Sequence, residues 1–115
     1  MLRVQSSEIA GRGVFTTQPL SVGDLIESCP VIVIPNEEVQ FLDKTVIYNY
    51  YFDWKDGQAA IVLGFGSLYN HSQNNNATYY KRFDYDMIEF RCVKSIKAYE
   101  EITVFYQQGT WFFEA

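Results

Sequence analysis

Apolar and polar residues alternate in two stretches of the second half of the chain, at 87–93 and 102–106. Alternation with a period of two is typical of a β-strand that buries one face, so both stretches predict half-buried strands. Further short apolar runs, separated by turn-forming glycine, proline, asparagine and aspartate, lie at 4–9, 14–16, 25–34, 59–63 and 78–81. The pattern therefore predicts a mainly β protein with many short strands and little helix.

Two runs in the first half of the chain are less clear. The run 25–34 is apolar and β-branched but contains Pro30, which cannot donate a ladder hydrogen bond, so it predicts two short strands or an edge strand with a kink. The run 45–54 has the β-branched and aromatic residues of a strand, but some of them recur at helical spacing. Between these runs, Asn36 precedes two glutamates and is expected to cap a short helix.

Composition limits the class of protein. A chain of 115 residues is long enough for one domain and too short for two, so we expect residues 1–115 to form a single domain. A hydrophobic content of 48% excludes disorder, and no apolar run is long enough to span a membrane. The net charge of −5 argues against binding to nucleic acid and suits a basic partner, although mild acidity also simply aids solubility.

Metal chemistry is not expected. Cys29 and Cys92 are far apart and belong to no CxxC pattern, and the chain has one histidine, His71. These residues cannot supply the usual ligand sets of a zinc site, so both cysteines are expected to be reduced and packed.

The stretch 63–77, LGFGSLYNHSQNNNA, is the strongest candidate for a ligand site. It follows a predicted buried strand and contains Asn70, His71 and the asparagine run 74–76. Such a density of amide side chains is stable next to a core only when the amides find hydrogen-bond partners. The stretch therefore predicts a tight, hydrogen-bonded turn that can hold a polar small molecule.

Three segments occur in an order that resembles a known family. They are GRGVF at 11–15, NHS at 70–72 followed by Asn76, and EEITVFY at 100–106. Together they resemble the SET domain, and the resemblance covers nearly the whole chain. The small size and the LGFG run look most like the compact viral and bacterial members, which lack pre-SET and post-SET regions.

The resemblance implies a fold. SET domains have a β-clip fold of small curled sheets with a C-terminal pseudoknot, in which the last segment passes under a loop. This arrangement would place the 70–72 segment beside the 100–106 strand, although about thirty residues separate them. The chain departs from the family pattern at Tyr99, where the family usually has glycine.

The resemblance also implies a function. It predicts an S-adenosylmethionine-dependent protein-lysine N-methyltransferase, similar to the histone-lysine enzymes, whose substrate is a lysine-containing protein or basic peptide. The alternative is a non-catalytic SET-like module that binds protein. A bacterial or viral source would place the protein in the cytoplasm, or in the nucleus of a host cell, and the aromatic tail would suit a homodimer.

Individual residues are assigned by the same resemblance. Tyr106 is expected to be the catalytic residue that orients the amine at the point where it meets the methyl donor. The residues expected to bind the cofactor are Arg12, Gly13, Asn70, His71, Tyr106 and Trp111. The residues expected to line the lysine channel are Tyr51, Tyr79 and Val104.

Several of these assignments have a purely structural alternative. Arg12 and Gly13 also fit an ordinary turn, and strand packing explains Tyr51 and Tyr79 nearly as well. His71 also suits a structural brace and is not expected to act as a general base. No metal site is expected.

Overall fold

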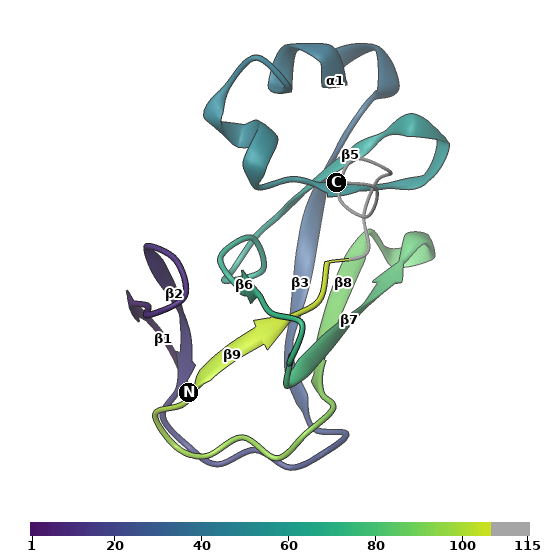
Figure 1. The fold of residues 1–115 in the computed structure, drawn as a ribbon. Helices are drawn as coiled ribbons and strands as arrows, with labels where there is room; N and C mark the ends of the chain where they lie inside the picture. Colours follow the sequence, from purple (N-terminus) through teal and green to yellow (C-terminus); the bar gives the residue numbers. More distant parts are fainter. Residues whose placement is uncertain (107–115) are drawn as a thin grey trace.

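The computed structural model describes residues 1–106 of the chain (Figure 1). The strands of this part are β1 (Leu2–Ser6), β2 (Arg12–Thr16), β3 (Leu25–Ile34), β4 (Phe52–Asp53), β5 (Ala59–Val62), β6 (Asn70–His71), β7 (Ala77–Arg82), β8 (Met87–Cys92) and β9 (Glu101–Val104). The helical elements are α1 (Asn36–Leu42) and the 3-10 turns η1 (Val46–Asn49), η2 (Lys55–Gly57) and η3 (Phe83–Tyr85). The expected mainly β fold with little helix is confirmed. Among the helices of residues 1–106, none has the length and hydropathy that a membrane crossing requires.

The strands form two small sheets. One has the order β1-β2-β9-β6 and the other the order β4-β5-β3-β8-β7. Strand β9 lies between β2 and β6 and pairs in parallel with β6, with Asn70 opposite Thr103 and His71 opposite Val104. This pairing brings the NHS segment beside the last described strand, as the resemblance predicts, and Figure 1 shows the two strands meeting near the centre of the molecule.

The first strand of the N-terminal hairpin ends earlier than the sequence predicts. Strands β1 and β2 pair in antiparallel fashion, but β1 stops at Ser6 and not at Ile9. The hydroxyl of Ser7 accepts the Ile9 N–H at 2.9 Å, and the Ser7 N–H donates to the Gly11 carbonyl at 3.0 Å. Gly11 has φ +45°, a conformation that glycine adopts without strain. A local loop, held by its own hydrogen bonds, therefore replaces the end of the predicted strand.

The prediction for residues 25–34 is wrong in one respect. The run forms one continuous strand, β3, at the centre of the five-stranded sheet. Its pairing nevertheless divides at Pro30, because residues 25–30 pair with β8 and residues 31–34 pair with β5. Each half has a single neighbour, so the missing N–H of Pro30 breaks no ladder, and a proline is tolerated in a central strand.

The segments around α1 also differ from expectation. Pro35, and not Asn36, occupies the N-cap position, where no side chain caps the helix. The Asn36 amide instead donates to the Asp56 carbonyl at 3.0 Å and ties the helix to η2. The ambiguous run 45–54 divides into η1 and the two-residue β4, with Thr45 capping η1 by accepting the Ile47 N–H at 3.2 Å.

The core follows the alternation of the strands. Ile88, Phe90 and Cys92 on β8 are buried, whereas the intervening Glu89 and Arg91 are half-exposed, as predicted. In the other sheet Val14 is buried, but β9 does not show the alternation predicted for 102–106. Ile102, Thr103 and Val104 are all buried, and the strand ends at Val104, before Tyr106. Cys29 and Cys92 are unbridged and buried, as expected for packed thiols.

Candidate active site

Asn70 fixes the loop between β1 and β2 to the last described strand. Its side-chain nitrogen lies 2.8 Å from Glu101 Oε2 and 3.1 Å from Ser7 Oγ. The Ala10 and Arg12 carbonyls lie 3.2 and 3.1 Å from the same nitrogen. The two amide hydrogens are therefore directed at protein acceptors, and through this nitrogen Asn70 braces the loop.

Gly13 makes this packing feasible. A Cβ at this position would lie 2.1 Å from Glu101 Oε2 and 2.9 Å from the Asn70 side-chain nitrogen. Glu101 cannot move away easily, because its other oxygen accepts the Ser7 hydroxyl at 2.7 Å. The second glycine of the GRG segment thus permits close packing of the loop on β9.

Tyr106 is held at its hydroxyl and at its ring. The hydroxyl donates to the backbone carbonyl of Tyr69. The ring meets Phe52 edge-on with centroids 5.3 Å apart, and the Tyr79 ring lies 6.0 Å away. Burial raises the pKa of Tyr106 well above its ordinary value, with a smaller contribution from Tyr79, so the hydroxyl keeps its proton near neutral pH.

His71 holds the backbone of the catalytic candidate. Its Nδ1 accepts the Tyr106 N–H at 3.2 Å, and its ring stacks at 6.2 Å on that of Tyr106. Burial lowers the pKa of His71, which favours the neutral imidazole. Only the neutral ring can accept at Nδ1, so hydrogen bonding and burial favour the same protonation state.

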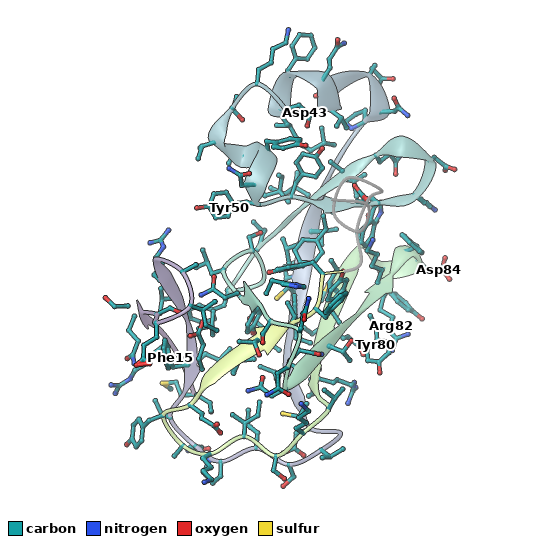
Figure 2. All side chains as sticks on the ribbon, viewed as in Figure 1. Phe15, Asp43, Tyr50, Tyr80, Arg82 and Asp84 are labelled. Carbon is teal, nitrogen blue, oxygen red and sulfur yellow. The ribbon has the colours of Figure 1, made fainter. Side chains whose placement is uncertain are left out.

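A cavity of about 520 Å³ lies beside Tyr106 and between the two sheets. Its described wall consists of residues 10–12, Asn49, Tyr50, Phe52, residues 67–71 and Tyr106. Figure 2 shows Tyr50 projecting on the same side of the view as the β1–β2 hairpin, away from Tyr80 and Arg82. The loop of residues 10–12, the segment 67–71 and Tyr106, two residues beyond β9, therefore surround one space.

The predicted site residues divide into two groups. Arg12, Asn70, His71 and Tyr106 are all part of the cavity wall, so the fold brings four of them together. Gly13 is buried behind this wall. The cofactor-binding roles of all five stay predictions, and Trp111 lies outside the described residues.

The three residues predicted for the lysine channel are not among the described residues that line the cavity. The Tyr79 ring packs behind it against Phe52, with centroids 5.1 Å apart, and Val104 is fully buried. The hydroxyl of Tyr51 donates to Asp43 at 2.7 Å. Their channel roles stay predictions.

Four residues of the described wall lie outside the segments that were predicted to form the site: Ala10, Asn49, Tyr50 and Phe52. Tyr69 lies inside the stretch 63–77 but had no predicted role of its own. Tyr50 lies in the run 45–54, from which only Tyr51 was predicted as a site residue. The importance of Tyr69 lies in its carbonyl, for which no sequence signal exists. Within residues 1–106, no cluster of three His, Cys, Asp or Glu side chains is arranged to hold a metal ion.

Two solved structures share this fold. A Plasmodium falciparum protein assigned as a histone methyltransferase superposes with a TM-score of 0.77 at 25% identity, covering 95% of this chain and 99% of that one. The PRC2 complex that contains Ezh2 gives a TM-score of 0.74 at 18% identity, covering 99% of this chain and 16% of that one. The second likeness shows the fold alone.

Sequence comparison identifies the family. The chain is 32% identical over 112 residues to a Schizosaccharomyces pombe histone-lysine N-methyltransferase specific for lysine 37 of histone H3. The alignment covers 96% of this chain and 76% of that protein. The family model described as "SET domain" matches residues 11–107. Together with the cavity built around Asn70, His71 and Tyr106, these matches confirm the resemblance seen in the sequence: the chain belongs to the SET domain family of lysine methyltransferases.

Proposed function

We propose that this chain transfers a methyl group from S-adenosylmethionine to the side-chain amine of a lysine in a basic protein. The observation that carries the proposal is the position of Tyr106. Its hydroxyl is held by a hydrogen bond to the Tyr69 carbonyl, and both residues are part of the wall of the cavity that Arg12, Asn70 and His71 also line. The fission-yeast relative is a histone-lysine enzyme, which supports a histone-like substrate. The net charge of −5 is complementary to such a substrate.

The cavity has properties that suit the cofactor. Its volume of about 520 Å³ is within the range of pockets for nucleoside-sized ligands. A Cβ built at Gly11 would meet nothing within 4 Å, so the backbone there is accessible to a ligand. Arg12, Asn70, His71 and Tyr106 would hold the cofactor, mainly through the backbone at the first three.

The reaction needs alignment more than acid or base. When bound, S-adenosylmethionine supplies a methyl group on a positively charged sulfur. A free lysine has a pKa of about 10.4, so the chain must favour its neutral form. The buried ring of Phe52, which lines the cavity beside Tyr106, excludes water and disfavours a charged amine.

Tyr106 orients the reacting groups in this proposal. Its hydrogen is directed at the Tyr69 carbonyl, so towards any further partner the hydroxyl oxygen acts as an acceptor. An acceptor at this point attracts the hydrogens of the amine and of the polarised methyl group. His71 fixes the Tyr106 backbone, and no residue needs to take a proton from Tyr106.

The test is transfer of labelled methyl groups to histone H3 by the purified chain. We expect the wild type to label H3, and Tyr106→Phe to lower kcat about 100-fold, because the hydroxyl acts mainly in the transition state. Tyr85→Phe, at a tyrosine that is 77% exposed, is the matched control and should leave the rate unchanged. A Tyr106→Phe enzyme with the wild-type rate would contradict the assignment.

A further inference from the structure

A carboxylate outside the cavity wall is linked to the catalytic candidate. Glu27 lies on β3, just after a register shift in the pairing of β3 with β8. Such irregularities redirect side chains next to functional sites. The Tyr69 hydroxyl donates to Glu27 Oε1 at 2.6 Å, a short bond of the charge-assisted type.

Tyr69 connects this carboxylate to Tyr106. Its side chain is bound to Glu27, and its backbone carbonyl accepts the Tyr106 hydroxyl. Tyr69 is 2% exposed, and its ring packs on Phe90 with centroids 4.5 Å apart. The position of the carbonyl therefore depends on how firmly the buried side chain is held.

Glu27 also holds the turn that leads to Tyr69. Its second oxygen lies 3.5 Å from the Phe65 N–H and 3.0 Å from where a Cβ of Gly64 would be. Gly64 has φ +66°, so the turn needs glycine both for its conformation and for the space beside the carboxylate. One carboxylate thus fixes both ends of the segment 64–69.

We propose that Glu27 and Tyr69 are positioning residues that aim the Tyr106 hydroxyl at the reacting methyl group; this inference rests on the proposed function. Glu27 touches neither substrate nor cofactor and acts through Tyr69. A small displacement of a group at the reacting centre lowers the rate of the chemical step but changes substrate binding little. Loss of the Glu27–Tyr69 hydrogen bond therefore lowers kcat and leaves both KM values nearly unchanged.

The first experiment measures steady-state kinetics of Glu27→Leu, Tyr69→Phe and Glu27→Gln. We expect the first two to lower kcat about tenfold with little change in KM. Glu27→Gln retains an acceptor for the Tyr69 hydroxyl and should retain most of the activity. Glu89→Leu makes the same substitution at a carboxylate that pairs with Arg82 on the outside of the sheet, and it should behave like the wild type. Equal losses in Glu27→Gln and Glu27→Leu would overturn the proposal.

A double-mutant cycle tests whether Glu27 acts through Tyr106. In the Tyr106→Phe background there is no hydroxyl to aim, so Glu27→Leu should cause no further loss of kcat. If the two losses multiply, Glu27 acts independently of Tyr106 and the proposal is wrong.

The last experiment does not depend on methyl transfer. Tyrosine labelled with ¹³C at Cζ reports the hydrogen bonding of each phenol by NMR, and the Tyr106 signal is identified by its loss in Tyr106→Phe. We expect this signal to shift in Glu27→Leu and in the milder Tyr69→Phe, and to stay in place in Glu89→Leu. An unmoved signal in Tyr69→Phe overturns the positioning role even if the wild type is active. If the signal shifts in these variants but the wild type methylates no substrate, the hydrogen-bond chain is supported and only the proposed function is wrong.

Discussion

At the scale of single residues, we expect His71 to make the stability of the folded protein depend on pH. Burial lowers its pKa below the ordinary 6.5 of the unfolded chain. The folded protein therefore binds fewer protons than the unfolded one in this range, and the contribution of His71 to stability is complete only above the unfolded pKa. We expect the free energy of unfolding to fall as the pH drops from about 7 towards the folded pKa of His71.

Proton NMR of the single histidine gives its midpoint directly, and urea unfolding at each pH gives the stability. His71→Asn is the control, because asparagine keeps an uncharged acceptor about where Nδ1 lies. We expect the variant to lose most of the pH dependence that the wild type shows between about pH 7 and the folded pKa of His71. A midpoint at or above the unfolded value would contradict the prediction.

Tyr99 is strained in a way that can be relieved. It has φ +68°, and its N–H donates to the Thr16 carbonyl at 2.6 Å, which fixes this conformation. The side chain is 71% exposed, so its removal loses little packing. The left-handed conformation costs a residue with a Cβ about 1 kcal/mol relative to glycine, so we expect Tyr99→Gly to stabilise the fold by about that amount.

Urea unfolding measures this change. Tyr85→Gly is the matched control, because Tyr85 is 77% exposed but is not among the positive-φ residues of the described chain. Glycine should destabilise the protein there. A loss of stability in both variants would show that the Tyr99 backbone is not strained.

Residue roles were predictable from the sequence only where the chemistry resides in a side chain of a recognisable motif. Asn70, His71 and Tyr106 lie together as the resemblance implies. Glu27 was missed because its partner Tyr69 is 42 positions away, and neither residue belongs to a motif. The role of Tyr69 depends on a backbone carbonyl, which every residue has.

At the scale of elements, the side chain of Asn76 makes hydrogen bonds to β9 that a neighbouring strand would otherwise make. The Asn76 amide donates to the Glu101 carbonyl at 2.9 Å and accepts the Thr103 N–H at 2.9 Å. These are the bonds that a neighbouring strand residue would make to β9. Removing them leaves two polar backbone groups of a partly buried strand without partners, so we expect Asn76→Ala to lower the free energy of unfolding by about 2–4 kcal/mol.

The asparagine run contains its own control. Asn74 is exposed and bonds the Lys94 ammonium at the surface, so Asn74→Ala should cost less than about 0.5 kcal/mol. Chemical denaturation of both variants measures the difference. Equal effects at the two positions would show that the bonds of Asn76 to β9 add nothing to stability.

Elements were predictable where one face is buried. The alternation predicted for β8 is present because a shift by one residue would expose its buried side chains. In β9 it is absent, because Thr103 on the opposite face is buried as well. The prediction failed for β3, because the effect of Pro30 depends on which strand pairs with each half. It stayed open for residues 45–54, because η1 and β4 are too short for a period to develop.

At the scale of the molecule, the cavity lies where the two sheets meet. Residues 10–12, β6 and Tyr106 belong to the first sheet or its extensions, whereas Phe52 belongs to the second. We therefore expect a ligand in this cavity to contact both sheets and to bind only when they are folded against each other. Binding should therefore stabilise the whole fold and not one element alone.

The demethylated cofactor, S-adenosylhomocysteine, tests this directly. A ligand at 100 times its Kd stabilises the folded state by about 2.7 kcal/mol. For a domain of about 100 residues this corresponds to a rise in Tm of roughly 10 °C. ATP at the same concentration is the control, because it shares the adenosine but lacks the amino-acid part that the loop of residues 10–12 would hold. A clear rise with S-adenosylhomocysteine and none with ATP supports a cofactor site between the sheets, whereas no rise at millimolar S-adenosylhomocysteine would favour a SET module that binds protein without catalysing methyl transfer.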